Sequence, residues 1–163
     1  MTEHPISDAG LPNFAPWHRR LWEIEHGPRC GDEFNLLEKG KNYGWPVIVL
    51  GINYPGTKIG DAIVEKSGLE QPRYYWDPVI APSGLVFYKG DLFPLWKSSV
   101  LVGGLRGQDL SRLELGKDDK VVNEEVLLTG LNERIRDVRV FQDGAVYLLT
   151  DGAGGKLLKL TPK

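Results

Sequence analysis

One structural unit recurs along this chain, and the recurrence restricts the fold more than any other feature. Residues 100–115 (VLVGGLRGQDLSRLEL) read as an apolar strand, a glycine-containing turn and an alternating strand, and residues 146–160 (VYLLTDGAGGKLLKL) repeat this plan. The offset is about 46 residues, close to the length of one blade of a β-propeller. Residues 21–38 (LWEIEHGPRCGDEFNLLE) form a looser third copy. The repeat therefore predicts a row of similar small sheets.

Strand-like segments also precede two of the copies. SGLVFY (residues 83–88) leads into one copy, and IRDVRVF (residues 135–141) leads into another, with Asp143-Gly144 as a hairpin turn. We expect this hairpin to form the outer part of its blade. Propellers close with about four to eight blades, so the sequence predicts an all-β fold and a partial propeller of about three blades.

Composition excludes several classes of protein. The 163 residues are 41% hydrophobic and 26% charged, which is typical of a globular chain rather than a disordered one. The net charge of -2 argues against a general nucleic-acid or anionic-membrane binder, because both need a basic excess. No apolar run has the length of a membrane helix, and the first residues do not read as a secretory signal. The single cysteine, Cys30, predicts no internal disulfide.

An ordered series of motifs resembles a known family. The motifs are HGPRCGDEFNL, GKNYGWPV, GINYPG, YYWDPVIAPSGLVFY, DLFPLWKSSVLVGGLRGQ and ERIRDVRVFQDGAVYLLTD. Together they resemble the C-terminal half of the soluble aldose sugar dehydrogenases that depend on pyrroloquinoline quinone (PQQ), in the glucose/sorbosone dehydrogenase family. The resemblance runs over residues 21–163, and residues 1–20 match poorly. It implies a six-bladed β-propeller of which about three blades are present.

The first candidate site is the turn HGPRCGDE. Its Gly27-Pro28 pair predicts a rigid turn with free carbonyl oxygens, and Ca²⁺ takes several oxygen ligands. In the family this pair lends carbonyl oxygens to the calcium that holds the quinone, and Glu33 and Tyr43 match positions that hold a second calcium. The alternative is a plain turn with a solvated acidic pair. Cys30 replaces the usual family glycine, and its side chain is expected to crowd the turn if that position needs a positive φ.

The second candidate site is the segment ERIRD. Arg134 and Arg136 alternate, so on a strand they share one face. Two guanidinium groups on one face form a receptor for carboxylates, and PQQ is a tricarboxylate. The alternative is a pair of surface arginines balanced by acidic neighbours. The resemblance implies that Arg134, Ile135 and Arg136 contact the cofactor.

Two further segments are implied in the pocket by the resemblance. GGLRG supplies Gly104, Leu105 and Arg106 as cofactor contacts, with Arg106 at a position that often carries lysine, although the same segment also reads as a simple strand and turn. Tyr54 lies in an insertion rich in glycine, proline and aromatic residues, and it matches a tyrosine that lines the substrate and cofactor pocket. For the tryptophans, aromatic packing within the blades is at least as good an interpretation.

The resemblance implies PQQ-dependent oxidation of an aldose at C1 to the lactone, with hydride transfer to calcium-bound PQQ. The family's general-base histidine lies in a blade upstream of this segment, so no catalytic residue is assigned here, and His26 is interpreted as a packing histidine. The isolated chain is expected to have little activity. The alternatives are a truncated, inactive half-propeller that pairs with itself or with a complementing N-terminal half, and a carbohydrate-binding module. Family members are mostly periplasmic, which implies the same location.

Overall fold

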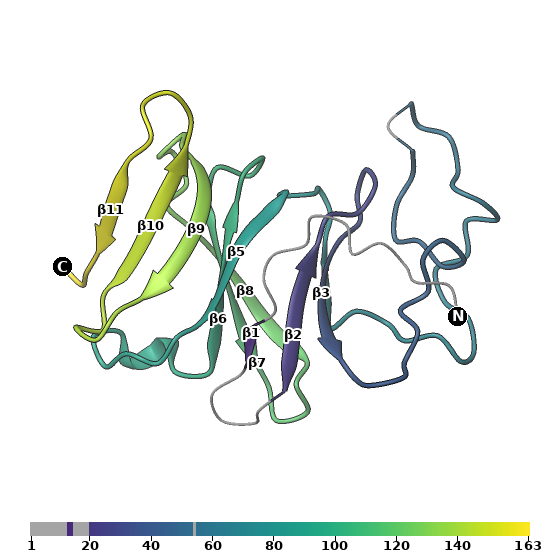
Figure 1. Cartoon of the computed structure of the whole chain (residues 1–163), viewed down its shortest axis with the longest axis horizontal. Helices are drawn as coiled ribbons and strands as arrows, with labels where there is room; N and C mark the ends of the chain where they lie inside the picture. The colour runs from purple at the N-terminus through teal and green to yellow at the C-terminus, as the bar shows by residue number, and fades with distance from the viewer. Residues whose placement is uncertain (1–12, 15–19, 54) are drawn as a thin grey trace.

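Three antiparallel sheets stand side by side in the structure, a computed structural model that describes residues 13–14, 20–53 and 55–163 (Figure 1). The strand orders are β1-β2-β3-β4, β5-β6-β7-β8 and β11-β10-β9. The predicted all-β, partial-propeller fold is confirmed. Its strands are β1 (Asn13–Phe14), β2 (Leu21–Glu25), β3 (Asp32–Leu37), β4 (Tyr74–Trp76), β5 (Pro82–Phe87), β6 (Ser99–Gly104), β7 (Leu110–Leu115), β8 (Val121–Leu127), β9 (Arg134–Val140), β10 (Val146–Asp151) and β11 (Leu157–Leu160), with one short 3-10 helix, η1 (Pro94–Trp96).

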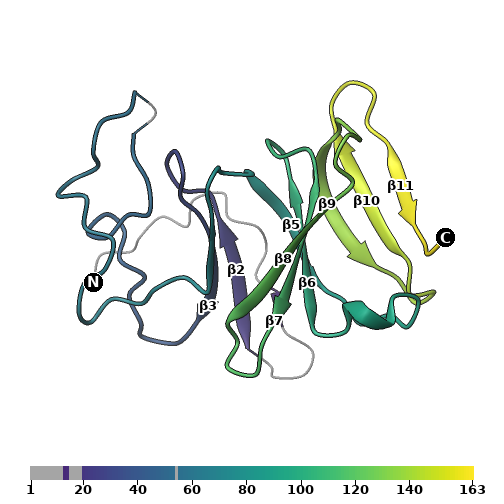
Figure 2. The ribbon, with the colours of Figure 1, turned by 180° about the vertical axis from the view of Figure 1, so that it is seen from behind.

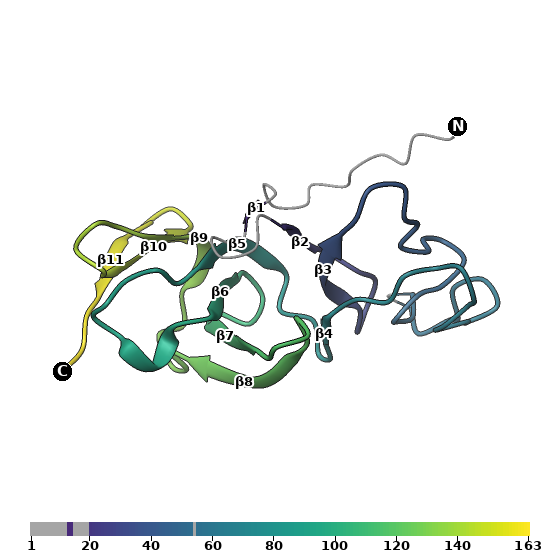
Figure 3. The same cartoon turned by 90° about the horizontal axis from the view of Figure 1, so that it is seen from below.

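The three sequence repeats are hairpins in equivalent places, β2-β3, β6-β7 and β10-β11, and the two lead-in segments are β5 and β9. Asp143-Gly144 does form the β9-β10 turn, where Gly144 has a φ of 74°. The expected outer position of this hairpin is wrong, because β9 packs against β5 and β6 while β11 lies at the free edge. In Figure 3, β5 lies between β9 on one side and β1 and β2 on the other, and neighbouring sheets approach one another through these strands. Apolar alternation alone does not reveal which end of a blade lies inside.

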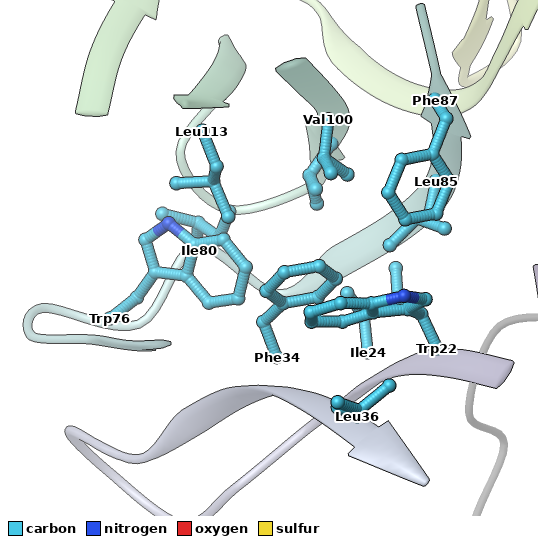
Figure 4. Packing of buried hydrophobic residues seen from close by; sticks show 11 residues of the cluster. Trp22, Ile24, Phe34, Leu36, Trp76, Ile80, Leu85, Phe87, Val100 and Leu113 are labelled. Carbon is cyan, nitrogen blue, oxygen red and sulfur yellow. The ribbon is translucent and has the colours of Figure 1, made fainter. Parts of the chain in front are cut away.

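Aromatic side chains fill the space between the first two sheets. Alternation along β2 places Trp22 and Ile24 on one face, and both are buried. The Trp22 ring stacks on Phe34 with centroids 4.6 Å apart and meets Phe87 edge-on (Figure 4). Burial of such large apolar groups is the main force that holds one blade against the next.

A second apolar cluster joins the middle sheet to the third. Its buried members are Tyr88, Leu101, Leu110, Ile135, Val138, Val146 and Leu148. The outer face of the third sheet is different, since Leu149 and Leu157 lie opposite each other on β10 and β11 and are 47% and 67% exposed. This sheet also has three described strands where the other two have four (Figure 2).

The tryptophans divide between packing and exposure. Trp76, on β4, is buried, and its indole N–H donates to Glu124 at 2.9 Å. The same carboxylate accepts from the hydroxyls of Tyr74 at 2.6 Å and Ser111 at 2.7 Å, so it ties β4 to the middle sheet. Trp45, for which packing within the blades was one of two open interpretations, is 56% exposed. In the described part of the chain, no helix is long and apolar enough to cross a membrane.

Candidate functional site

Four segments meet at one end of the three sheets, the upper end in Figure 1, and three of them carry predicted cofactor or calcium residues. The four segments are the β2-β3 turn (residues 26–31), the segment before β5 (residues 77–81), the β6-β7 turn (residues 105–109) and the first residues of β9. Because neighbouring strands are antiparallel, these turns share one edge. The fold therefore gathers motifs that lie more than a hundred residues apart in the sequence.

A cavity of about 350 Å³ opens at this end between the first and second sheets. It brings together two predicted residues, Gly27 and Arg106, and adds the charged side chains of Arg29 and Asp32, which sequence reasoning did not assign. Its lining is His26, Gly27, Arg29, Asp32, Val79, Ala81 and Arg106. A larger cavity of about 560 Å³ lies at the opposite end, where β5 and β9 finish, and contains none of the predicted site residues.

The Gly27-Pro28 turn is tightly closed. A Cβ atom on Gly27 would lie 1.7 Å from the carbonyl oxygen of Gly31, so no larger residue fits there. The insertion returns to brace the turn, because the Ile52 N–H donates to the Arg29 carbonyl at 2.9 Å. Cys30 has a φ of 71°, so the position does require the conformation that glycine adopts most easily. A hydrogen bond with Asp77 is the main cause of the raised pKa of the Cys30 thiol.

Asp32 is not part of a solvated acidic pair, as the alternative interpretation proposed. Its side chain is 2% exposed. Oδ1 accepts the Gly27 N–H at 3.0 Å and Oδ2 accepts the Ala81 N–H at 2.7 Å. Burial raises the pKa of this carboxyl, and neighbouring backbone amides and His26 oppose that rise. Both oxygens are thus committed to backbone groups of the first and second sheets.

Glu33 belongs to an acidic group on the opposite face of the first sheet. It lies across from Glu25, and burial together with that neighbour raises the pKa of Glu33 to about 8. Burial also raises the pKa of Glu23 to about 7, with Glu25 adding to the rise. Desolvated carboxylates without a cationic partner favour their protonated forms, and a bound cation reverses this preference.

Tyr43 is not joined to Glu33 through its hydroxyl. That hydroxyl donates to the Leu36 carbonyl at 2.6 Å and accepts the Glu38 N–H at 2.8 Å. Within the described ranges, no group of three or more His, Cys, Asp or Glu side chains is arranged to hold a metal ion. A calcium ion near Glu33 therefore needs backbone oxygens to complete its ligands, which is a donor set that calcium accepts.

Arg134 and Arg136 meet on a single carboxylate. Arg134 Nε and Nη2 each donate to Asp151 Oδ2 at 3.2 Å, and Arg136 Nη2 donates to the same oxygen at 2.8 Å. The two guanidinium groups hold the pKa of Asp151 below its usual range. Both arginine side chains stay about half exposed, at 47% and 52%, so one carboxylate is shared by two partly free cations. The pair retains a net positive charge and open donors toward solvent.

The GGLRG segment connects the arginines to the cavity. Arg106 donates through Nη1 to the Val79 carbonyl at 2.8 Å, and the Leu105 carbonyl accepts from Arg134 Nη1 at 3.4 Å. The side chains of Leu105 and Ile135 are buried in the core and do not face the cavity. The space beside Gly104 is occupied by the Asp109 carboxylate, which a Cβ would approach to 2.7 Å.

His26 and Tyr54 complete the list of predicted residues. His26 Nε2 lies 2.7 Å from the Pro82 carbonyl, which agrees with a positioning rather than a catalytic histidine. Tyr54 lies outside the described residues. Asp32, Arg29 and Asp151 are the site residues that sequence reasoning missed, and the available signal was their position within or beside the motifs already singled out.

Comparison with known proteins places this chain in a family. The Glucose / Sorbosone dehydrogenase family model matches residues 10–159. The aldose sugar dehydrogenase YliI of Escherichia coli K12 is 47% identical over 149 residues, which are 91% of this chain and 40% of that protein.

Solved structures support the same family. A crystal structure of a glucose dehydrogenase has a TM-score of 0.89 and 48% identity over 94% of this chain and 44% of its own. The PQQ-bound aldose sugar dehydrogenase of Streptomyces coelicolor has a TM-score of 0.70 and 25% identity over 93% of this chain and 42% of its own. The chain thus spans less than half the length of these relatives, and it belongs to the glucose/sorbosone dehydrogenase family.

Proposed function

We propose that this chain forms the C-terminal half of the cofactor site of a PQQ- and calcium-dependent aldose dehydrogenase. The observation that carries the proposal is the gathering of the Gly27-Pro28 turn, Arg106 and the Arg134–Arg136 pair at one end of adjoining sheets. A relative with a solved PQQ-bound structure supports the choice of cofactor. When bound, PQQ supplies the hydride acceptor for oxidation of the sugar at C1 to a lactone, and calcium supplies a Lewis acid.

The arginines of this chain bind and orient the anionic cofactor. Arg134 and Arg136 are held by Asp151 with donors still open, so they can pair with carboxylates without first paying the full entropic cost of becoming ordered. Arg106 and Arg29 add positive charge at the cavity. Two arginines in the cavity lining, with the Arg134–Arg136 pair joined to the same turn through the Leu105 carbonyl, favour a multiply charged anion over a neutral sugar alone. This distinguishes the proposal from a carbohydrate-binding module.

We assign calcium to two places. The carbonyl oxygens of the Gly27-Pro28 turn suit a cation beside the cofactor, because the turn is tightly closed and a carbonyl oxygen carries no proton that a cation must displace. Glu33, with backbone oxygen near Tyr43, suits a second ion that relieves the repulsion with Glu25. Neither ion depends on the carboxylate of Asp32, which is occupied by amides.

The alternative is an incomplete half-propeller that needs a partner to act. The exposed pair Leu149–Leu157 and the three-stranded third sheet favour association, because apolar sheet faces and free edges recruit neighbours. The partner is a second copy or a complementing N-terminal half, which also brings the general base. We therefore expect the isolated chain to show little aldose oxidation. A periplasmic location is proposed on family resemblance alone.

A chimera tests the proposal. Residues 21–163 replace the matching segment of the Escherichia coli relative, and oxidation of glucose by a dye acceptor is measured with PQQ and Ca²⁺. The proposed function predicts PQQ-dependent turnover by the chimera and a large loss in the same chimera with Arg134→Ala and Arg136→Ala. A folded chimera that binds no PQQ would contradict it. Turnover by the isolated chain at the rate of an intact relative would contradict the incomplete-site account.

A further inference from the structure

Asp32 is the only side chain among the described residues that accepts hydrogen bonds from the backbone of both the Gly27 turn and the segment before β5. Asp32 is the first residue of β3 in the first sheet, yet its Oδ2 accepts a hydrogen bond from Ala81, 49 residues later in the sequence. The residue is almost fully buried, and in the described part of the chain it has no ion-pair partner. Its role is therefore to hold two backbone segments in a fixed relation.

The segment held by Asp32 also anchors the basic half of the site. The Ala81 carbonyl accepts the Leu105 N–H at 3.0 Å, and the Ile80 carbonyl accepts the N–H groups of Arg106 at 2.8 Å and Gly107 at 3.1 Å. Leu105 in turn accepts from Arg134. An unbroken series of hydrogen bonds thus runs from the Gly27 turn through Asp32 to the arginines.

Only a carboxylate suits this position. Asp32 faces two N–H donors with two acceptor oxygens, whereas an asparagine would present one acceptor and one NH₂ donor. In the Asp32→Asn variant one of the two amides would face a donor in a buried place, which is costly because neither group reaches water. His26 provides a weaker second tie through its bond to the Pro82 carbonyl.

We propose that Asp32 is a positioning residue that sets the distance between the carbonyl turn and the arginines, and so the affinity for an anionic cofactor held between them. The cofactor part rests on the proposed function. The backbone part does not, since it concerns hydrogen bonds of the chain itself. Both carboxylate oxygens of Asp32 accept backbone amides, so its effect on Arg106 and Arg134 runs through the Ala81 segment.

The matched control is Asp119→Asn. Asp119 is also buried and also joins the first two sheets, through an ion pair with Arg20. It lies in the β7-β8 turn, at the end of the sheets opposite the site (Figure 1). Both variants remove one negative charge from a joint between the same sheets, so a general loss of stability affects them alike.

The experiment measures amide hydrogen exchange and PQQ affinity in the full chain. In Asp32→Asn we expect exchange at Gly27 or Ala81 to be faster by about tenfold or more than in the unmutated chain, and PQQ binding with Ca²⁺ to be weaker by about tenfold. Asp119→Asn should leave both unchanged at temperatures where it is folded. His26→Ala, a substitution at an exposed site, should also weaken PQQ binding, by a smaller factor than Asp32→Asn. This variant provides the test if Asp32→Asn does not fold.

The outcomes separate the two proposals. Unchanged exchange at both amides in folded Asp32→Asn would overturn the positioning role. An equal loss of PQQ affinity in Asp119→Asn would overturn it as well. If Asp32→Asn fails to fold, unchanged PQQ affinity in His26→Ala would overturn it. If the unmutated chain binds no PQQ, the proposed function fails, and faster exchange confined to Gly27 or Ala81 still supports Asp32 as the joint between the sheets.

Discussion

Arg136 donates a 2.8 Å hydrogen bond to Oδ2 of Asp151, the same oxygen that accepts both bonds from Arg134. Two cations therefore share one acceptor and keep donors to spare. Such a pair is ordered before a ligand binds, and it keeps a net positive charge. These are the two properties that a receptor for a polycarboxylate needs.

Replacement of Arg136 by alanine should weaken PQQ binding by about tenfold or more, because a charge-assisted hydrogen bond contributes about 1.5–3 kcal/mol. Titration of PQQ by absorbance or calorimetry measures the effect. Arg139→Ala is the matched control, since Arg139 is equally exposed on the same strand and also pairs with an aspartate. Equal losses in the two variants would mean that the effect is one of net charge.

Stability should fall as the pH rises from about 5 to about 8. The pKa values of Glu23 and Glu33 are raised to about 7 and about 8 in the folded chain from 4.5. The folded state therefore binds more protons than the unfolded state in this window, and this stabilisation is complete below pH 4.5 and is lost as the pH passes the folded values.

Glu33→Gln isolates that effect. The variant should be more stable than the parent at pH 8 by about 1 kcal/mol or more and should gain little at pH 5. Urea unfolding at the two pH values measures this difference, and Glu38→Gln, an exposed position, serves as control. Added Ca²⁺ should stabilise the parent at pH 8 and not the Gln variant. A Gln variant with the same pH dependence as the parent would contradict the account of this acidic group.

The sequence predicted more of the fold than of the site, for a physical reason. Strand alternation and glycine turns are local signals, so β2-β3, β6-β7 and β10-β11 were predictable as repeats. The contacts of Asp32 with Ala81 and of Arg134 with Leu105 join segments 49 and 29 residues apart, and no local pattern encodes them. For the same reason the acidic pair at 32–33 could be interpreted as solvated, although Asp32 is buried.

Cys30→Gly should stabilise the chain. A non-glycine residue in the left-handed region costs about 1–2 kcal/mol, and the extra freedom of glycine in the unfolded chain returns about 0.5–1 kcal/mol of that, so a net gain of roughly 0.5–1 kcal/mol is expected. Thermal or urea unfolding under reducing conditions measures it. A loss of stability would indicate that the contact of the thiol with Asp77 outweighs the backbone strain.

Glu124→Ala should destabilise the joint between the first two sheets by about 2–4 kcal/mol, because three donors lose their acceptor in a partly buried place. Trp76 fluorescence should shift to longer wavelength as water reaches the ring. Glu114→Ala, at an exposed position on β7, should change stability by less than about 0.5 kcal/mol. Unaltered stability in the Glu124 variant would mean that aromatic packing alone joins the sheets.

Titration of the 163-residue chain with PQQ, in the presence of Ca²⁺ and again after its chelation, tests the central claim most directly. The account predicts saturable binding of one PQQ per chain that weakens by at least about tenfold when calcium is removed. Absence of binding under both conditions, or binding of equal strength with and without calcium, would contradict it.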